Sequence, residues 1–199
     1  DADRCIKTDH STFISIARSR SIPARYIRFF IKLWKYASRY DCIYAQDTLS
    51  AGLPARIVAM LLRKPLVVKV VGDPAWERAQ QQGITKDFLD DFQNKRYSAR
   101  IELVRKLSRW VVAGADRVIT PSEYLKKIVL GWGIESKKIH VVHNAVSFPE
   151  KDQVIPQWPE GKVILYVGRL VAWKGLEHVI TVLSVLVREI VDTHFVIIG

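Results

Sequence analysis

Residues 163–177 constrain the fold of this chain more than any other segment. An uninterrupted apolar run over 163–167 predicts a buried strand, Gly168 interrupts it, and Lys174-Gly175 precedes a stretch with helical periodicity. A strand that passes through a glycine turn into a helix is the unit from which parallel α/β sheets are built. The helix N-terminus then presents unpaired backbone N–H groups at the carboxyl edge of the sheet. The segment therefore predicts an α/β fold with an anion site at this loop.

Two cations flank the predicted loop. The planar guanidinium of Arg169 can bind two phosphate oxygens at once, and the ammonium of Lys174 adds a compact positive charge. Either residue alone would be typical of a solvated surface loop. Their placement around a strand–loop–helix step, next to Gly168, favours phosphate binding instead. The sequence thus predicts that Gly168, Arg169 and Lys174 hold a phosphate or diphosphate.

The same residues carry a family resemblance. Gly168-Arg169-Leu170, followed after three residues by Lys174-Gly175, resembles the donor-site signature of GT-B glycosyltransferases of the glycogen synthase-like group (family 4, or group 1). Three further segments resemble this family in the expected order: 115–122, 141–146 and 195–199. The resemblance implies a GT-B architecture, which consists of two Rossmann-like parallel-sheet domains. It also implies that Arg169 and Lys174 bind the diphosphate of a nucleotide sugar.

The resemblance further implies an activity. A sugar would move from a nucleotide-diphosphate donor to a hydroxyl acceptor, either a glycan or a lipid-linked molecule, with retention of anomeric configuration. Cationic side chains and a helix dipole would stabilise the departing diphosphate, so neither a cofactor nor a divalent metal is expected. The resemblance assigns no catalytic residue in this chain, because Val71 stands where relatives often have a histidine.

Strand-like and helix-like segments alternate along the chain and predict its domains. We expect an N-terminal acceptor-side Rossmann-like domain over 1–148, a proline-rich interdomain linker over 149–161, and the start of a nucleotide-sugar-binding domain over 162–199. The first strand and glycine-rich loop of the family are not visible, and its paired-glutamate motif would lie past Gly199. We therefore expect an internal fragment, with the N-terminal domain nearly complete and the C-terminal domain truncated.

Individual elements follow from periodicity and turn residues. The sequence predicts a continuous helical segment over 86–113 and a helix capped by Ser122. Cys42 lies in an apolar run and is expected to be a small buried side chain. The remaining predicted strands are 41–45, 66–71, 116–120, 139–142 and 194–198, and the remaining helices are 50–63 and 175–191.

A second candidate site follows the predicted strand 66–71. Asp73 and Glu77 can bind sugar hydroxyls, and Trp76 can stack on a sugar face, at the strand end where ligands of open parallel sheets bind. The alternative is that Asp73 only caps a helix that begins at Pro74. Both interpretations remain open, and they are compatible with each other.

The charge of the chain is uneven. The formal net charge is +11, and residues 11–40 contain seven basic residues and no acidic one. Within 22–40, basic residues and apolar residues each recur at steps of three and four, which predicts an amphipathic basic helix. This helix could pack on the sheet with a solvated basic face, or it could contact an anionic membrane peripherally. The resemblance to enzymes with lipid-linked acceptors favours membrane contact.

Two rival functions remain at this stage. One is a phosphosugar enzyme of the same architecture, such as a nucleotide-sugar epimerase. The other is a non-enzymatic basic module that binds membranes or nucleic acid. Nucleic acid is not expected, because no zinc spacing, aromatic RNA-binding motif or helix-turn-helix is present. With two cysteines and no disulfide pattern, we expect a cytoplasmic protein, associated in one interpretation with the inner face of the cell membrane.

Overall fold

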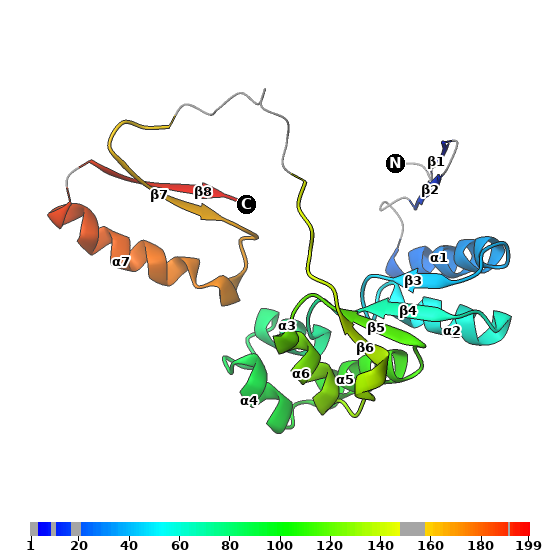
Figure 1. Ribbon diagram of the computed structural model, residues 1–199. Coiled ribbons are helices and arrows are strands. Elements are labelled where there is room, and N and C mark those ends of the chain that lie inside the picture. Colours follow the sequence, from blue (N-terminus) through cyan, green and yellow to red (C-terminus); the bar gives the residue numbers. More distant parts are fainter. Residues whose placement is uncertain (1–3, 9–10, 17–20, 148–157, 191) are drawn as a thin grey trace. The chain divides into compact units, whose positions relative to one another are not determined.

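The computed structural model describes residues 4–8, 11–16, 21–147, 158–190 and 192–199. The chain divides into two compact units, the first formed by residues 1–76 and 87–144 and the second by residues 77–86 and 145–199 (Figure 1). Most of the predicted linker, residues 149–157, lies outside the described residues. The two units are described separately below.

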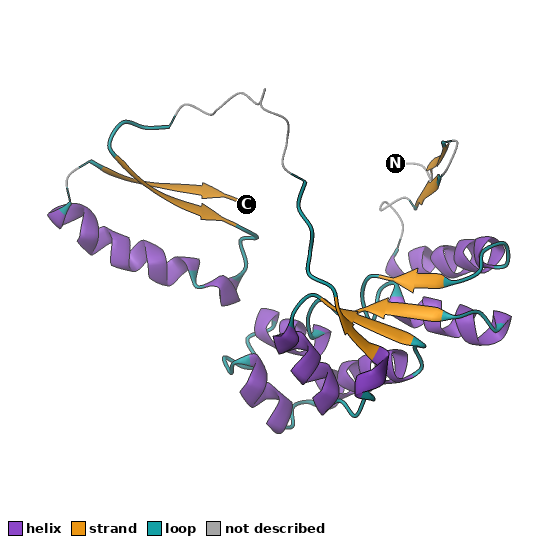
Figure 2. Cartoon of the chain, viewed as in Figure 1, coloured by secondary structure: helices purple, strands orange, loops and turns teal. Residues whose placement is uncertain are grey.

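The first unit is built on a four-stranded parallel sheet. Its strands are β3 (Ile43–Ala45), β4 (Leu66–Lys69), β5 (Arg117–Thr120) and β6 (Ile139–Val141), and they lie in this order across the sheet (Figure 2). The prediction of a parallel α/β sheet is thus confirmed. Each observed strand is one or two residues shorter than predicted: β3 and β5 begin later, and β4 and β6 end earlier because the apolar pattern continues into the turns that follow them.

Helices connect these strands. They are α1 (Ile22–Ala37), α2 (Gly52–Leu62), α3 (Pro74–Gln81), α4 (Leu89–Asn94), α5 (Ala99–Ala113) and α6 (Glu123–Gly131), with a short 3₁₀ turn η1 (Ser136–Lys138) before β6. Helices α1 and α2 pack side by side (Figure 1). α2 ends at Arg63, which is in the left-handed conformation with φ of 53° and is followed by Lys64-Pro65, so the chain turns sharply into β4.

Burial alternates along the strands and defines the core of the first unit. In β4, Leu66 and Val68 are buried while Val67 and Lys69 are only partly so, and β3 and β5 follow the same period of two. The buried side chains of the strands meet those of the helices, and together they form one cluster. Its helical members are Ala37, Ala55, Val58, Ala59, Val111, Val112, Ile128 and Val129. This core fixes the carboxyl edge of the sheet, where the candidate site lies.

The predicted continuous helix over 86–113 is wrong. The chain forms α4 and α5 instead, and between them Lys95 is extended, with φ of −110° and ψ of 155°. The Tyr97 ring stacks on the Phe92 ring at a centroid separation of 4.5 Å, which holds the connection against α4. The apolar periodicity of the sequence continues across the break, because each helix contributes fully buried side chains such as Phe92 on α4 and Ile101 on α5.

Two further features differ from expectation. An antiparallel hairpin of β1 (Arg4–Lys7) and β2 (Thr12–Ser15) precedes α1, and the sequence analysis did not predict it. Its strands are only four residues long, which is too short for a clear period-two pattern. Cys42 is exposed rather than buried, because it lies just before β3 and outside the sheet.

Apart from residues 77–86, which include the end of α3, the second unit contains a strand, a helix and a strand at the predicted places. The strand predicted to be buried over 163–167 is not buried, because Val163, Leu165 and Val167 are exposed. β7 (Lys162–Val167) and β8 (Thr193–Ile198) are parallel neighbours, and α7 (Leu176–Glu189) connects them (Figure 2). A short 3₁₀ turn, η2 (Ala172–Lys174), lies between β7 and α7. The loop that carries the predicted diphosphate site is therefore the β7–α7 connection.

No helix in the described part of the chain combines the length and apolar character needed to cross a membrane.

Candidate functional site

Three strands of the first unit pass into helices at the same edge of the sheet, and in each connection an aspartate or serine side chain accepts hydrogen bonds from backbone N–H groups. After β3, Asp47 accepts hydrogen bonds from the backbone N–H groups of Leu49 at 2.8 Å and Ala51 at 2.9 Å. After β5, Ser122 accepts from the N–H of Leu125 at 3.3 Å, as predicted. Asp73 has the corresponding place after β4. Three helix N-termini are thus fixed at the carboxyl edge of the sheet.

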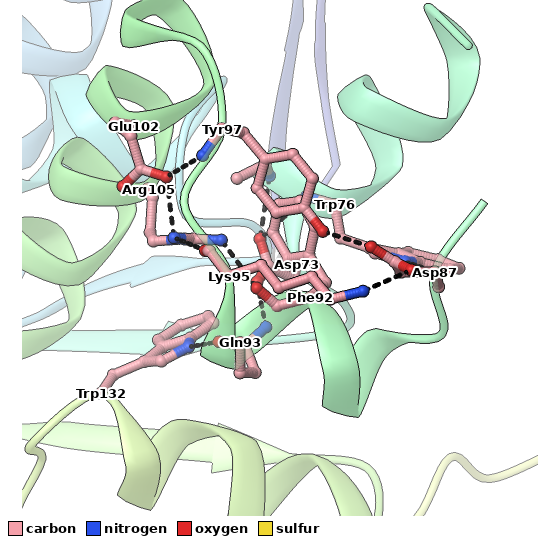
Figure 3. Close-up of polar contacts among 11 residues, drawn as sticks. Asp73, Trp76, Asp87, Phe92, Gln93, Lys95, Tyr97, Glu102, Arg105 and Trp132 are labelled. Atoms are coloured by element: carbon pink, nitrogen blue, oxygen red, sulfur yellow. Dashed lines mark hydrogen bonds and ion pairs between the residues drawn. The ribbon is translucent and has the colours of Figure 1, made fainter. Parts of the chain in front are cut away.

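The Asp73 carboxylate is buried, with 2 % of the residue exposed. One oxygen accepts hydrogen bonds from the N–H groups of Ala75 at 2.9 Å and Trp76 at 3.2 Å, in the first turn of α3. The other oxygen accepts from the Gln93 side-chain amide at 2.8 Å (Figure 3). The capping interpretation of Asp73 is therefore confirmed, and both carboxylate oxygens are engaged within the protein.

The other two acceptor-side candidates follow Asp73 in the first turn of α3. Trp76 is half-buried, and its indole N–H donates to the backbone carbonyl of Asp87 at 2.9 Å (Figure 3). Glu77 is also half-buried. Val71 is 53 % exposed at the end of β4, so its side chain presents an apolar surface where a histidine would supply a proton-transfer group. The fold brings these residues together at one strand end.

Asp87 connects the segment after α3 to the α4–α5 connection. Its carboxylate accepts a hydrogen bond from the Tyr97 hydroxyl at 2.7 Å and forms an ion pair with Lys95 at 2.8 Å (Figure 3). The hydrogen bond to Asp87 raises the pKa of Lys95. With the bond from Trp76, three side chains converge on Asp87, so the loop that ends at α4 is held to α3.

Arg105, on α5, contacts the end of α4 and the α4–α5 connection. Its guanidinium donates to the carbonyls of Phe92 at 3.0 Å and Lys95 at 3.1 Å and pairs with Glu102 at 2.8 Å. It also lies over the Phe92 ring at 4.5 Å (Figure 3). Burial lowers the pKa of Arg109, one turn further along α5, and the nearby positive charge of Arg105 adds to this effect. Arg105 thus binds two carbonyls at the break between the helices and holds the end of α4 to α5.

Asp87, Gln93, Tyr97 and Arg105 were not among the candidates predicted from the sequence. Several of their partners lie 10 to 39 residues away along the chain, so local spacing does not mark these contacts. The one available signal was Ser98 followed by Glu102, which is typical of a helix start and would have divided the predicted helix.

A second polar group lies at the carboxyl edge of the sheet. The ammonium of Lys69, on β4, donates to the Asn144 side-chain oxygen at 2.8 Å, beyond the end of β6. His143 is exposed, and its Nδ1 lies 3.1 Å from the carbonyl of Pro121. These contacts tie the segment after β6 to the neighbouring strand ends and leave the other ring nitrogen of His143 at the surface.

The β7–α7 loop of the second unit contains the predicted diphosphate site. The N–H of Gly168 donates to the carbonyl of Ile198 at 2.9 Å, and the Tyr166 hydroxyl donates to the carbonyl of Arg169 at 3.2 Å. The side chains of Arg169 and Lys174 are exposed, and among the described residues neither has a hydrogen bond or ion pair. Backbone contacts therefore shape the loop and leave both cations available to a ligand.

Gly175 begins α7 in a left-handed conformation, with φ of 68°. Its carbonyl accepts hydrogen bonds from the N–H groups of His178 at 3.0 Å and Val179 at 3.2 Å, so the turn continues directly into the helix. At the neighbouring strand end, a β-carbon on Gly199 would lie 2.6 Å from the carbonyl oxygen of Gly168. The absence of side chains thus lets the ends of β7 and β8 approach each other beside the loop.

Among the described residues, no group of three or more histidine, cysteine, aspartate or glutamate side chains is arranged to hold a metal ion.

Solved structures share this fold. HepE from Anabaena, in complex with UDP and glucose, is similar with a TM-score of 0.57 and 16% sequence identity, over 85% of this chain and 42% of that one. MnaA from S. aureus, in complex with UDP, is similar with a TM-score of 0.55 and 15% identity, over 92% and 47% of the two chains. A candidate UDP-N-acetylglucosamine 2-epimerase from Listeria monocytogenes is similar with a TM-score of 0.57 and 16% identity, over 96% and 48%. The chain thus spans less than half the length of these relatives.

The sequence family is established over the first unit. No curated protein matches the chain. The model of Glycosyltransferase Family 4 matches residues 3–148, which is more than half of the chain. The match covers the parallel sheet and all three capped strand ends. The expected GT-B fold, with its Rossmann-like parallel sheets, is confirmed, and the chain belongs to glycosyltransferase family 4.

Proposed function

We propose that the complete protein transfers a sugar from a nucleotide-diphosphate donor to a hydroxyl acceptor, which is a glycan or a lipid-linked molecule. The observation that carries the proposal is the β7–α7 loop, where Arg169 and Lys174 are exposed and unpaired among the described residues. A guanidinium and an ammonium beside a helix N-terminus favour a diphosphate. Membership of glycosyltransferase family 4 supports the same class of substrate.

In this proposal Arg169 and Lys174 stabilise the negative charge that develops on the diphosphate as the bond to the sugar breaks. Gly168 lets the backbone turn without a side chain between the strand end and the ligand. Retention of anomeric configuration is part of the proposal and follows from the family resemblance. No cofactor and no divalent metal take part, because the two cations and the dipole of α7 supply the positive charge.

The acceptor-side candidates remain part of the proposal, with distinct roles. The buried contacts of Asp73 support a positioning role, in which it fixes the first turn of α3. Trp76 and Glu77, in that turn, would then contact the acceptor through an aromatic face and a carboxylate. We also propose a cytoplasmic location for the enzyme, which is consistent with the two free cysteines.

The test is calorimetric titration of UDP- and GDP-sugars into the complete protein. We expect the Arg169→Ala/Lys174→Ala variant to bind the donor at least tenfold more weakly, since each charge-assisted contact is worth about 1.5–3 kcal/mol. Lys162→Ala is the matched control, because Lys162 is an exposed cation at the opposite end of the same strand. Unchanged affinity in the double variant would remove the diphosphate site from the proposal.

A nucleotide-sugar epimerase is the second candidate function. The fold that this chain shares with the Listeria protein favours this candidate. The two activities differ in their need for an acceptor. A transferase releases the nucleoside diphosphate when an acceptor is added, whereas an epimerase converts the nucleotide sugar alone. Incubation of the donor without an acceptor, followed by NMR of the sugar ring protons, distinguishes them.

A further inference from the structure

His143 follows β6 at the carboxyl edge of the sheet, and its ring is held by the neighbouring strand. The N–H of Val142 donates to the carbonyl of Thr120 at 2.9 Å, which continues the pairing of β5 and β6 past the end of β6. At the next residue, Nδ1 of His143 lies 3.1 Å from the carbonyl oxygen of Pro121. The imidazole therefore has a defined place beside the connection from β5 to α6.

The residue after His143 is held by a different strand. The side-chain oxygen of Asn144 accepts a hydrogen bond from the ammonium of Lys69, on β4, at 2.8 Å. This bond spans β5, which lies between β4 and β6 in the sheet. The segment that contains His143 is thus held against the strand ends that lead into α3 and α6, where ligands of open parallel sheets bind.

The contact with Pro121 decides which ring nitrogen of His143 carries the hydrogen. A backbone carbonyl only accepts hydrogen bonds, so Nδ1 of the neutral imidazole is the donor. Nε2 then has no hydrogen and presents a lone pair. The residue is exposed, and among the described residues Nε2 has no hydrogen-bond partner. The structure therefore leaves one oriented proton acceptor open to solvent at this edge.

Two carboxylates at the same edge are committed to the backbone instead. Both oxygens of Asp73 accept hydrogen bonds within the protein. One oxygen of Asp47 accepts from backbone N–H groups, and the other accepts from the Ser50 hydroxyl at 2.6 Å. Nε2 of His143 has no such role, and an imidazole takes up and releases a proton readily near neutral pH.

We propose that Nε2 of His143 is the general base that accepts the proton of the acceptor hydroxyl, an inference that rests on the proposed sugar transfer. In this step the acceptor oxygen forms a bond to the anomeric carbon of the donor sugar, and the bond from that carbon to the diphosphate breaks. The electron pair of the broken bond leaves with the nucleoside diphosphate, and the hydroxyl proton moves to Nε2. The imidazolium keeps its hydrogen bond to the carbonyl of Pro121 and then returns the proton to solvent.

The test measures release of the nucleoside diphosphate by the complete protein from UDP-glucose and GDP-mannose, with water and with octyl glucoside as hydroxyl acceptors. In His143→Asn the amide nitrogen takes the place of Nδ1 and can still donate to Pro121, but nothing replaces Nε2. His143→Ala removes both nitrogens. The matched control is His140→Asn, because His140 is an exposed histidine within β6. Glu77→Gln tests the carboxylate of α3 as a rival base.

We expect His143→Asn to lower the turnover rate about 10²- to 10⁴-fold, the range for loss of a general base, while calorimetric donor affinity stays unchanged. Added imidazole should restore part of the turnover to His143→Ala, which a merely structural role of the ring would not allow. His140→Asn should match the wild type in turnover and in donor affinity. Heteronuclear NMR of the histidine side chains should show His143 with its hydrogen on Nδ1.

Three results would overturn the inference. The first is a His143→Asn variant that turns over as fast as an active wild-type protein, an outcome that leaves the proposed transfer intact. The second is a His143→Ala variant that imidazole does not restore, together with a hydrogen on Nε2 by NMR. The third is loss of turnover in Glu77→Gln but not in His143→Asn. A wild-type protein that releases no diphosphate from either donor would instead refute the proposed transfer, and the inference with it.

Discussion

The Gln93 side-chain amide donates to the buried Asp73 carboxylate at 2.8 Å. Its oxygen accepts from the Trp132 indole N–H at 3.0 Å (Figure 3). A carboxylate only accepts hydrogen bonds and an indole N–H only donates, so just one orientation of the amide satisfies both partners. Gln93 therefore connects the cap of α3 to α4 and to the end of α6.

The first prediction concerns this bridge. In Gln93→Glu a second carboxylate faces Asp73, so a hydrogen bond is replaced by repulsion between like charges. We expect the free energy of unfolding at neutral pH to fall by about 2 kcal/mol or more, because a buried acceptor loses its donor. Urea denaturation measures the change. Gln81→Glu, an exposed position on α3, is the control and should unfold within about 0.5 kcal/mol of the wild type.

The second prediction concerns Arg105. Its side chain is 7 % exposed, and Arg105→Met removes the donors to two carbonyls and the ion-pair partner of Glu102. We expect the free energy of unfolding to fall by about 3–5 kcal/mol, the range for breaking a buried ion pair. Trypsin should also cut faster after Lys95 or Arg96. Arg100→Met, an exposed residue on the same helix, should change neither measurement; equal effects would contradict the role of Arg105.

The third prediction concerns pH. Burial raises the pKa of Tyr124 from 10.0 to about 12, and the hydrogen bond to Asp90 adds to the shift. Because the folded pKa exceeds the unfolded one, the contribution of Tyr124 to stability is complete below about pH 10 and is lost as the pH rises toward about 12. Tyr124→Phe should reduce this alkaline loss of stability in urea titrations at several pH values, whereas Tyr40→Phe, an exposed tyrosine, should leave it unchanged.

The fourth prediction concerns Gly175. A residue with a β-carbon pays about 1–2 kcal/mol in the left-handed conformation that Gly175 adopts. The position is otherwise open, since the nearest atom to an added β-carbon is the Cδ2 of His178 at 3.9 Å. Gly175→Val should therefore lower the melting temperature and weaken donor binding, and Gly175→Asn should do so less, because asparagine tolerates this conformation. Equal effects of the two substitutions would indicate a steric cause instead.

The scaffold was largely predictable from the sequence because its determinants are local. Strand β4 lies within the predicted range 66–71, α2 ends before Pro65, and Ser122 caps α6. Each of these features depends on neighbours within a few positions. The β7–loop–α7 step was equally visible, since Gly168 and Gly175 mark both of its turns. Periodicity and turn residues report such features directly.

The contacts inside the candidate site were not predictable, because the residues that make them are far apart in the sequence. Gln93 meets Asp73 20 residues away and Trp132 39 residues away, and only the assembled fold brings these three together. The exposure of Ile27, Ile31 and Trp34 on α1 was hidden as well, because helical spacing shows which residues share a face but not which face meets the core.

The capped strand ends have a consequence for how this scaffold can change. Asp47 and Ser122 each accept hydrogen bonds from the turn that follows their own strand. Asp73 also accepts a hydrogen bond from Gln93 on α4, so the α3 segment can be exchanged only together with this contact. A connection can then be exchanged for one of different length or composition while the sheet beneath stays intact. Under the proposed function, transplanting the α3 segment from a relative is therefore a route to a new acceptor preference, provided that the residue facing Gln93 remains a carboxylate.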